Sequence, residues 1–336
     1  MKEIERLKEI LGSTKKIVIV PHKSPDGDAI GSCLGLHLYL KQKGHQSSVV
    51  APNDYPKFLK WLPEEDTIVN FEKDHEKAEN LIEEAELVFT LDFNHLSRSG
   101  GLEEHLSKSD ATFVMIDHHQ QPDDYATFTY SDAAMSSTCE MVFHFLKKLG
   151  EEETINKEIA TCLYVGIMTD TGSFRFASTT STTHRVIATL IDKGAKNASI
   201  HQQVFDTNSY ERMQLLGVAL NNMKVLPKYK TAYITLSQKE LDTHKFKKGD
   251  TEGFVNYSLG VEGIKFAAIF IEDAEQEIIK ISLRSKGDFD VNKVAREHFD
   301  GGGHINAAGG KSEKDLKETA IYFESILEAY KNELQQ

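Results

Sequence analysis

Short apolar runs rich in β-branched residues alternate with helical patterns along the first part of the chain. Four of these runs have the length of a buried strand, and they lie at residues 17–20, 48–50, 87–91 and 113–116. Consecutive parallel strands need a crossover between them, and a helix is the usual crossover. The alternation therefore predicts an α/β fold with a doubly wound, mainly parallel sheet.

The remainder of the chain changes character twice. Helical patterns occupy residues 137–149, 156–168, 182–193 and 210–222. After Pro227, strand-like runs return at residues 231–236, 265–272 and 277–283, and a last helical pattern covers residues 314–334. A chain of 336 residues is too long for one comfortable hydrophobic core. We predict a first domain over residues 1–190, a helical connector over 191–225 and a smaller α/β domain over 226–336.

The charge balance limits the substrates that the chain can hold. It carries 39 basic and 52 acidic residues, a formal net charge of −13. Proteins that hold long nucleic acid neutralise many phosphates with a broad basic surface, and this composition does not supply one. We therefore expect no binding of long nucleic acid, and a nucleic-acid substrate should be short or held locally.

The sequence predicts a cytoplasmic protein without a membrane segment. Residues 1–12 read as a charged amphipathic helix and not as a signal peptide. No apolar run approaches the roughly 20 residues that span a bilayer. Cys33, Cys139 and Cys162 lie far apart and form no CxxC pair, which favours buried, reduced thiols over disulfides or a zinc site.

Acidic and imidazole side chains follow three of the predicted strands. In an open parallel sheet, the carboxyl ends of the strands share one edge, where ligands bind. An acid also ends the helical pattern at residues 156–168 and is followed by a turn. The residues expected at this edge are His22, Asp26, Asp28, Asp92, Asp117, His118, His119 and Asp170.

Crowded carboxylates repel one another unless cations lie between them, so a metal cluster explains this group. Oxygen and imidazole ligands without thiolate favour Mn²⁺, Mg²⁺ or Co²⁺ over structural zinc. Each signal taken alone has a simpler interpretation: Asp92 or Asp170 as a helix cap, and Asp26 and Asp28 as turn residues. Their joint occurrence at one sheet edge favours the metal site.

These motifs resemble those of the DHH-family phosphoesterases. The chain contains His22-x-x-x-Asp26-x-Asp28, then Asp92, then Asp117-His118-His119, then Asp170. The C-terminal Gly301-Gly302-Gly303-His304 is similar to the glycine-rich loop of the substrate-binding domain in one branch of that family. The two-domain size is most similar to the oligoribonuclease/pAp-phosphatase group, whereas the RecJ exonucleases are longer and carry additional domains.

The resemblance implies a two-ion site in the first domain. His22 and Asp26 would bind one ion, and a second set would bind the other. Asp92 would bridge them, and His119 would face the phosphate as a hydrogen-bond donor or acid. The second set consists of Asp28, His118 and Asp170.

Three further groups are candidates for contacts with the substrate. Arg98, six residues after Asp92, can add positive charge to the site, although a solvated arginine is the alternative. Gly301, Gly302 and Gly303 would let backbone N–H groups approach an anion, with a helix start expected just after them, although a plain loop is the alternative. Arg284 and His304 are expected to supply donors to a phosphate or ribose.

The predicted function is hydrolysis of short RNA or DNA oligonucleotides, of linear dinucleotides such as pApA, or of pAp, with two Mn²⁺ ions as cofactors and Mg²⁺ or Co²⁺ as alternatives. Three other functions stay open: a DHH pyrophosphatase or polyphosphatase, a RecJ-like single-strand exonuclease, and an inactive nucleotide-binding protein. The glycine-rich loop argues against the first, and the complete ligand set against the last. The sequence does not determine the oligomeric state, and a homodimer is compatible with it.

Overall fold

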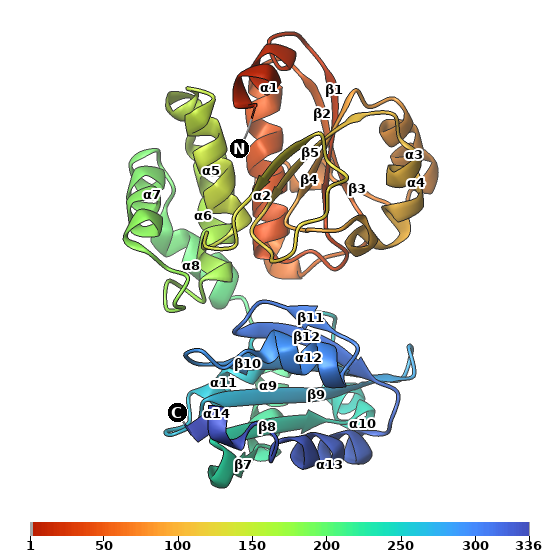
Figure 1. Ribbon diagram of the computed structural model, residues 1–336, viewed down its shortest axis with the longest axis vertical. Coiled ribbons are helices and arrows are strands. Elements are labelled where there is room, and N and C mark those ends of the chain that lie inside the picture. Colours follow the sequence, from red (N-terminus) through yellow and green to blue (C-terminus); the bar gives the residue numbers. More distant parts are fainter. Residues whose placement is uncertain (1–2, 336) are drawn as a thin grey trace. The chain divides into compact units, whose positions relative to one another are not determined.

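The computed structural model describes residues 3–335 and divides the chain into two compact units, Met1–Thr207 and Asn208–Gln336. Each unit has its own six-stranded sheet (Figure 1). The stretch expected as a connector, residues 191–225, is divided between them. Its helix α8 (Asn197–Phe205) packs against α6 (Lys157–Asp170) of the first unit, whereas α9 (Tyr210–Asn221) packs against β8 (Thr231–Leu236) of the second.

The first sheet is parallel throughout and has the strand order β3-β2-β1-β4-β5-β6. The order reverses between β1 and β4, which confirms the predicted doubly wound α/β class. The four predicted strands lie within β1, β2, β4 and β5, and the sequence missed the two short edge strands. The strands are β1 (Lys16–Pro21), β2 (Gln46–Ala51), β3 (Val69–Asn70), β4 (Leu87–Leu91), β5 (Thr112–Asp117) and β6 (Phe128–Ser131).

Both faces of this sheet are buried, because each is covered by helices. Along β1, Ile17 and Ile19 join one apolar cluster, whereas Val18 and Val20 join the cluster on the other side. Helices α2, α5 and α6 lie over the first face and α3 and α4 over the second (Figure 1). Besides α6, whose bounds are given above, these helices are α2 (Gly27–Gln42), α3 (His75–Glu83), α4 (Glu103–Lys108) and α5 (Thr138–Lys148), and the unit also contains α1 (Ile4–Ile10) and α7 (Ser181–Asp192).

Helix α2 is almost entirely buried, because it lies between the sheet and helices α5 and α6. Glycines on α2 allow a close approach to α6. A Cβ atom at Gly31 would stand 2.6 Å from the carbonyl oxygen of Cys162, and one at Gly35 would stand 2.7 Å from Leu163. The close packing of α2 and α6 brings the first turn of one helix next to the end of the other.

The second unit contains a mixed sheet in the order β11-β12-β10-β9-β8-β7, in which only β8 and β9 are parallel. Aromatic residues such as Phe266, Phe270 and Phe323 form its larger core, and α9 and α11 cover the opposite side. Its further elements are β7 (Lys224–Leu226), β9 (Phe266–Asp273), β10 (Ile278–Ser285), β11 (Gly302–Gly303), β12 (Ala307–Ser312), α10 (Gln238–Thr243), α11 (Phe254–Leu259), α12 (Val291–His298), α13 (Leu316–Ile326) and α14 (Lys331–Gln335).

Two local predictions for this unit were wrong. The single helix expected over residues 314–334 is interrupted by turns between α13 and α14. No helix starts after the glycine triplet, because Gly302 and Gly303 form β11 and the chain returns as β12. An antiparallel hairpin therefore replaces the expected helix N-terminus.

The amphipathic helix expected over residues 1–12 forms as α1, which spans Ile4–Ile10. Residues 1 and 2 of the expected range lie outside the described part of the chain. Within residues 3–335, the helices are too short or too polar to span a bilayer. Leu7 is buried against the first core, so α1 belongs to the first unit.

The packing of α2 against α6 leads to a stability prediction. Gly31→Ala should lower the free energy of unfolding by about 1–3 kcal/mol, because the added methyl group collides with a backbone carbonyl that cannot rotate away. Gly217→Ala in α9 is the matched control: among the described residues nothing lies within 4 Å of its Cβ position. That change should stabilise by up to about 1 kcal/mol through helix propensity. Denaturant unfolding of both variants measures the difference, and equal effects would contradict the packing argument.

Candidate metal centre

The ends of three neighbouring strands carry the predicted site residues of the first unit. His22 follows β1, Asp92 follows β4, and β5 ends at Asp117, which precedes His118 and His119. Strands β1, β4 and β5 are adjacent, and the strand order reverses between the first two. Ligand sites of doubly wound sheets lie at this reversal, outside the carboxyl ends of the strands.

Two helices contribute the remaining acids. Asp26 is the N-cap of α2, where its Oδ1 accepts hydrogen bonds from the backbone N–H groups of Asp28 and Ala29 at 3.0 and 3.1 Å. Asp28 lies in the first turn of α2, and Asp170 is the last residue of α6. The sequence considered a cap for Asp92 or Asp170 and a turn for Asp26, whereas the structure shows that Asp26 is the helix cap. Its second carboxylate oxygen remains for another partner.

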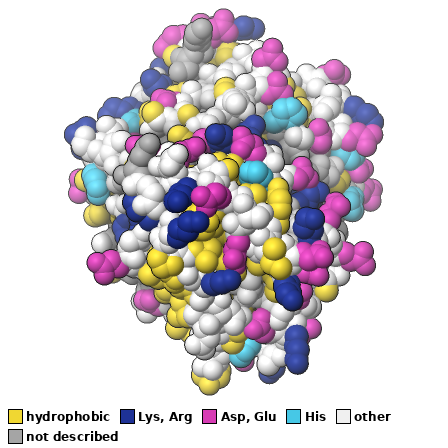
Figure 2. Space-filling view, turned by 60° about the horizontal axis from the view of Figure 1, so that its bottom comes forward, with side chains coloured by type: hydrophobic (Ala, Val, Ile, Leu, Met, Phe, Trp, Pro, Cys, Tyr) yellow, Lys and Arg dark blue, Asp and Glu magenta, His cyan; other side chains and the backbone are white. Residues whose placement is uncertain are grey.

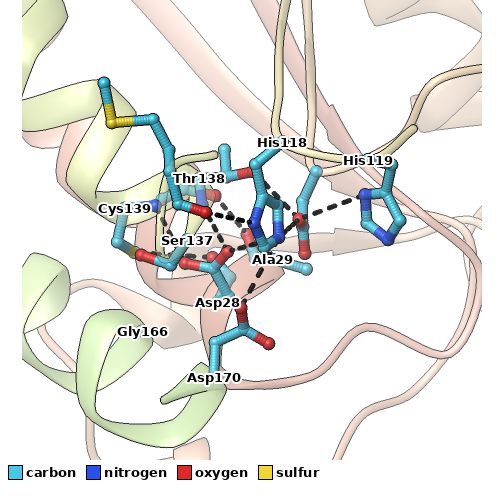
Figure 3. A network of polar contacts seen from close by, with 12 residues as sticks. Asp28, Ala29, His118, His119, Ser137, Thr138, Cys139, Gly166 and Asp170 are labelled. Carbon is cyan, nitrogen blue, oxygen red and sulfur yellow. Dashed lines mark hydrogen bonds and ion pairs between the residues drawn. The ribbon is translucent and has the colours of Figure 1, made fainter. Parts of the chain in front are cut away.

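Among the described residues of the first unit, the acids and imidazoles form three overlapping groups of potential metal ligands, and two of these consist of predicted ligands alone. His22, Asp26 and Asp92 make up the first group. Asp28, Asp92 and His118 make up the second, in which Nε2 of His118 lies 3.5 Å from Oδ2 of Asp170 (Figure 3). The structure thus brings together all six residues that the sequence predicted as metal ligands.

Asp92 belongs to both groups, and its two oxygens face different histidines. Its Oδ2 lies 3.5 Å from Nε2 of His22, and its Oδ1 lies 3.4 Å from Nε2 of His118. The residue has a φ of 67°, in the left-handed region that aspartate tolerates better than most residues. This backbone conformation, directly after β4, is how the carboxylate reaches between the two groups.

The separations within the groups suit ions better than direct hydrogen bonds. Nε2 of His118 lies 3.4 Å from Asp92, 3.5 Å from Asp170 and 3.7 Å from Oδ2 of Asp28. These separations are long for N–H···O hydrogen bonds. Two ligand atoms bound to one ion at about 2.1 Å stand about 3.0–3.5 Å apart. The donor set is therefore spaced for divalent cations.

Backbone carbonyls hold two of the imidazoles in the tautomer that a metal ligand needs. Nδ1 of His22 lies 2.8 Å from the carbonyl oxygen of Lys23, and Nδ1 of His118 lies 3.3 Å from that of Met135. A carbonyl only accepts, so each Nδ1 carries the proton. With a cation in place of the second proton, each ring would be neutral, and its Nε2, which faces the carboxylates, would be the ligand atom, as in many metal sites.

The protonation equilibria show how much negative charge is crowded here. Burial, and then repulsion from Asp92 and Asp170, raises the pKa of Asp28 well above its usual range. Burial also opposes ionisation of Asp92, but contacts with His118 and His22 outweigh it and lower the pKa of Asp92 well below its usual range. Burial lowers the pKa of His118, yet the contact with Asp92 and the charge of Asp170 raise it well above its usual value. Divalent cations would supply the positive charge that protons supply here.

His119 has a different partner from the other two histidines. Its Nδ1 lies 2.7 Å from Oδ1 of Asp117, a fully buried carboxylate. The other oxygen of Asp117 is also buried and has no hydrogen-bond partner among the described residues. Asp117 therefore fixes the orientation of the His119 ring.

Arg98 lies in the 3-10 helix Leu96–Leu102, which follows β4. Its backbone carbonyl accepts a hydrogen bond of 2.6 Å from the N–H of Lys23, which ties this segment to the loop after β1. Burial and the charge of Arg98 oppose protonation of His22, whereas Asp92 and Asp26 favour it and raise the pKa of His22. The guanidinium is thus close enough to act electrostatically on the first ligand group.

The glycine-rich segment of the second unit is shaped by close backbone packing. A Cβ atom at Gly301 would stand 2.0 Å from the carbonyl oxygen of Gly309, and one at Gly303 would stand 2.5 Å from the carbonyl oxygen of Ala307. Gly302 has more room, with Asn292 and Arg296 as its nearest neighbours at 3.6 and 3.9 Å. The hairpin itself therefore requires two of the three glycines.

Arg284 and His304 lie close to this hairpin. Arg284, near the end of β10, pairs directly with Ala307 of β12. The backbone N–H of His304 donates to the carbonyl oxygen of Ala307 at 2.7 Å, which closes the turn between β11 and β12. Both side chains are half-buried. The predicted substrate-binding residues thus gather at one end of the second sheet.

Sequence reasoning missed the residues that support the ligands. The backbone N–H groups of Thr138 and Cys139 donate to Asp28 at 2.6 and 2.8 Å (Figure 3). The hydroxyl of Thr138 donates to Asp92 at 2.9 Å. The capping pattern Ser137-x-x-Glu140 marks a helix start. Nothing in that pattern shows that the helix start faces Asp28 and Asp92, which lie 110 and 46 positions before Thr138.

Comparison with known proteins agrees with this architecture. Residues 16–167 match the DHH family, N-terminal domain, and residues 228–336 match the DHHA1 domain. A relative from Thermus thermophilus, named bifunctional oligoribonuclease and PAP phosphatase NrnA, is 35% identical and aligns over 95% of this chain and 90% of its own length. The chain belongs to the DHH family. This membership confirms the predicted resemblance and the predicted enzyme class, a phosphoric ester hydrolase.

Two solved structures extend the comparison. An exopolyphosphatase-related protein from Bacteroides fragilis is 41% identical, covers 99% of this chain and 97% of its own, and superposes with a TM-score of 0.95. RecJ from Thermus thermophilus in complex with Mn²⁺ is 13% identical and covers 99% of this chain but 55% of its own, with a TM-score of 0.55. The second likeness shows a shared fold alone.

The shared position of Asp92 leads to a prediction about metal binding. Asp92→Asn should weaken the binding of two Mn²⁺ ions by at least about tenfold each, because an amide is a poorer ligand in both groups. Asp170→Asn should weaken only one of them. Calorimetric titration of the chelator-stripped protein measures both stoichiometry and affinity, with Asp110→Asn, an exposed acid of the same unit, as control. Two ions bound to Asp92→Asn with unchanged affinity would contradict the shared role of this residue.

Proposed function

We propose that this DHH-family protein is a phosphoesterase that uses two Mn²⁺ ions to hydrolyse short oligonucleotides, linear dinucleotides such as pApA, and pAp. The observation that carries the proposal is the pair of ligand groups that share Asp92. The name of the Thermus relative, oligoribonuclease and PAP phosphatase, supports the substrate class. Mg²⁺ and Co²⁺ are alternative ions for the same oxygen and imidazole ligands.

His22 and Asp26 are proposed to hold one ion, Asp28, His118 and Asp170 the other, and Asp92 both. When bound, two such ions lower the pKa of a water and neutralise charge on the phosphoryl oxygens. The protein's own part is to keep the ligands in place. Backbone carbonyls orient the two histidine ligands, and the helix starts of α2 and α5 hold Asp26 and Asp28.

His119 is proposed to act as the hydrogen-bond donor or acid. Because Asp117 accepts the proton of Nδ1, Nε2 is the atom that can hold a proton toward the phosphate. The hydrogen bond from Nδ1 to Asp117 and the burial of both residues keep the ring from turning. Arg98 is proposed to stabilise the negative charge of the substrate beside the first ligand group.

The second unit is proposed to select the substrate. Arg284 and His304 carry donors for a phosphate or ribose, and Gly302 is the glycine of the triplet with room beside it. Because a hairpin replaces the expected helix start, recognition here is proposed to rest on side chains and on the half-buried backbone of the hairpin. The triplet Gly301 to Gly303 then serves mainly to let β11 lie close to β12.

Short substrates follow from the charge distribution. The formal net charge is −13. On the face drawn in Figure 2, the described Lys and Arg side chains are interspersed with Asp and Glu and do not merge into one basic surface. Long single strands are held by a basic groove that follows the backbone. We therefore propose that the protein holds a few phosphates at one place and does not hold long nucleic acid.

The cytoplasm is the proposed location. Cys33, Cys139 and Cys162 are all free and buried, as expected for a protein that folds in a reducing compartment. A homodimer stays a prediction.

A substrate panel tests the proposed function. Chelation should abolish hydrolysis, and Mn²⁺ should restore it better than Ca²⁺. The value of kcat/KM should be highest for pAp, pApA and oligonucleotides of a few nucleotides, and it should fall for strands of about 24 nucleotides, which need a longer basic groove. Binding to the Asp170→Asn variant should have a shallow salt dependence, with a log–log slope of about −1 to −2, because few phosphates are neutralised.

Other outcomes of this panel would reject the proposal in favour of a specific alternative. A steep salt dependence with a preference for long strands would indicate a RecJ-like exonuclease. Turnover of pyrophosphate or polyphosphate alone would indicate an exopolyphosphatase-type activity, for which the Bacteroides protein is named. Metal binding without turnover of any substrate would indicate an inactive nucleotide-binding protein.

The proposed division of labour between the two units can be tested separately. Arg284→Ala and His304→Ala should each raise KM for pAp by about tenfold or more, while hydrolysis of a small generic phosphodiester changes little. Lys280→Ala is the matched control, because it removes a positive charge from the same strand four residues away. Equal losses on both substrates would place Arg284 and His304 in the catalytic machinery or the fold.

A further inference from the structure

The first backbone N–H groups of helix α5 hold the carboxylate of Asp28 and are here called the backbone clamp. The N–H of Thr138 donates to Oδ2 of Asp28 at 2.6 Å, and the N–H of Cys139 donates to Oδ1 at 2.8 Å. Asp28 is 1% exposed, so bulk water does not compete with these two donors. Both oxygens of this acid are therefore held before any ion binds.

The capping arrangement of α5 leaves these two N–H groups available. The first N–H groups of a helix have no partner inside the helix. Ser137 caps only the N–H of Glu140, at 3.1 Å. The carboxylate of Asp28 accepts from the two preceding N–H groups, those of Thr138 and Cys139. The positive end of the helix dipole favours the negative charge of this carboxylate.

Thr138 also holds a second carboxylate through its side chain. Its hydroxyl donates to Oδ1 of Asp92 at 2.9 Å, and the threonine is fully buried. Oδ1 is the oxygen of Asp92 that faces His118. One residue thus bonds Asp28 through its backbone N–H (Figure 3) and Asp92 through its hydroxyl.

We propose that Thr138 is a positioning residue of the metal centre, whose hydroxyl sets the affinity of the ion between Asp28 and His118. Two acids that repel each other are kept at fixed separation by donors from one residue. Without the hydroxyl, Oδ1 of Asp92 loses the donor that holds this oxygen in place beside His118. This inference rests on the proposed two-ion centre and names a residue that governs it.

The backbone clamp cannot be removed by substitution, so the test isolates the hydroxyl. Thr138→Val keeps the shape and the N–H group but removes the donor. It should lower the affinity for one of the two Mn²⁺ ions by about 10- to 100-fold, which is the range found when hydrogen-bond partners of metal ligands are removed. Thr138→Ser keeps the donor and should bind both ions within about threefold of the unaltered protein. The measurement is calorimetric titration of the chelator-stripped full chain with Mn²⁺ alone.

A second pair of variants and a matched control complete the test. Thr138→Ser and Thr138→Ala both lack the methyl group and differ only in the hydroxyl, so their comparison decides the matter if Thr138→Val does not fold. Thr319→Val in the second unit removes a fully buried hydroxyl with a hydrogen bond of 2.9 Å to Ser312. It should leave Mn²⁺ affinity unchanged.

The outcomes separate this inference from the proposed function. Equal Mn²⁺ affinity in Thr138→Val, Thr138→Ala and Thr138→Ser would overturn the positioning role, even if the protein is a metal-dependent enzyme. A protein that binds no Mn²⁺ in its unaltered form would overturn the proposed centre itself. Turnover of Thr138→Val should recover when Mn²⁺ is raised, whereas a damaged fold would not be rescued in this way.

Discussion

The first unit has to stabilise several buried carboxylates that repel one another. Asp28, Asp92 and Asp117 are all buried at one edge of the sheet, where a low dielectric strengthens their repulsion. The chain offsets it with N–H donors from helix α5, with imidazoles and with the hydroxyl of Thr138. What remains is a negative site that divalent cations would complete.

The fold around this edge depends on the close packing of helices α2 and α6. Glycines let α2 and α6 pack at short distance, which brings Asp28 and Asp170 to the same place although they come from opposite helix ends. Gly166 shows how tightly the packing and the site are linked, since a Cβ atom there would stand 2.8 Å from Oδ1 of Asp28. A substitution in this helix contact would therefore disturb the acids directly and not only the core.

The second unit contributes a different kind of surface. Its glycines serve a tight hairpin, and its charged candidates, Arg284 and His304, lie near the turn of that hairpin. The first unit thus carries the groups suited to phosphoryl chemistry, and the second carries groups suited to recognition. The proposed function accordingly assigns the chemistry to the DHH domain and the choice of substrate to the DHHA1 domain.

The sequence by itself determined the parallel sheet, its four main strands and the acids that follow them, because buried strands and their ends leave a local pattern. It identified the six candidate ligands through motif and strand position, while their roles as ligands remain a prediction. Only the tertiary structure decided that α5 begins against Asp28, that Asp92 turns one oxygen to each histidine, and that the glycine triplet enters a hairpin in place of a helix start. These features depend on contacts between segments far apart in the chain, and local pattern carries no record of which distant backbone group will lie against a given side chain.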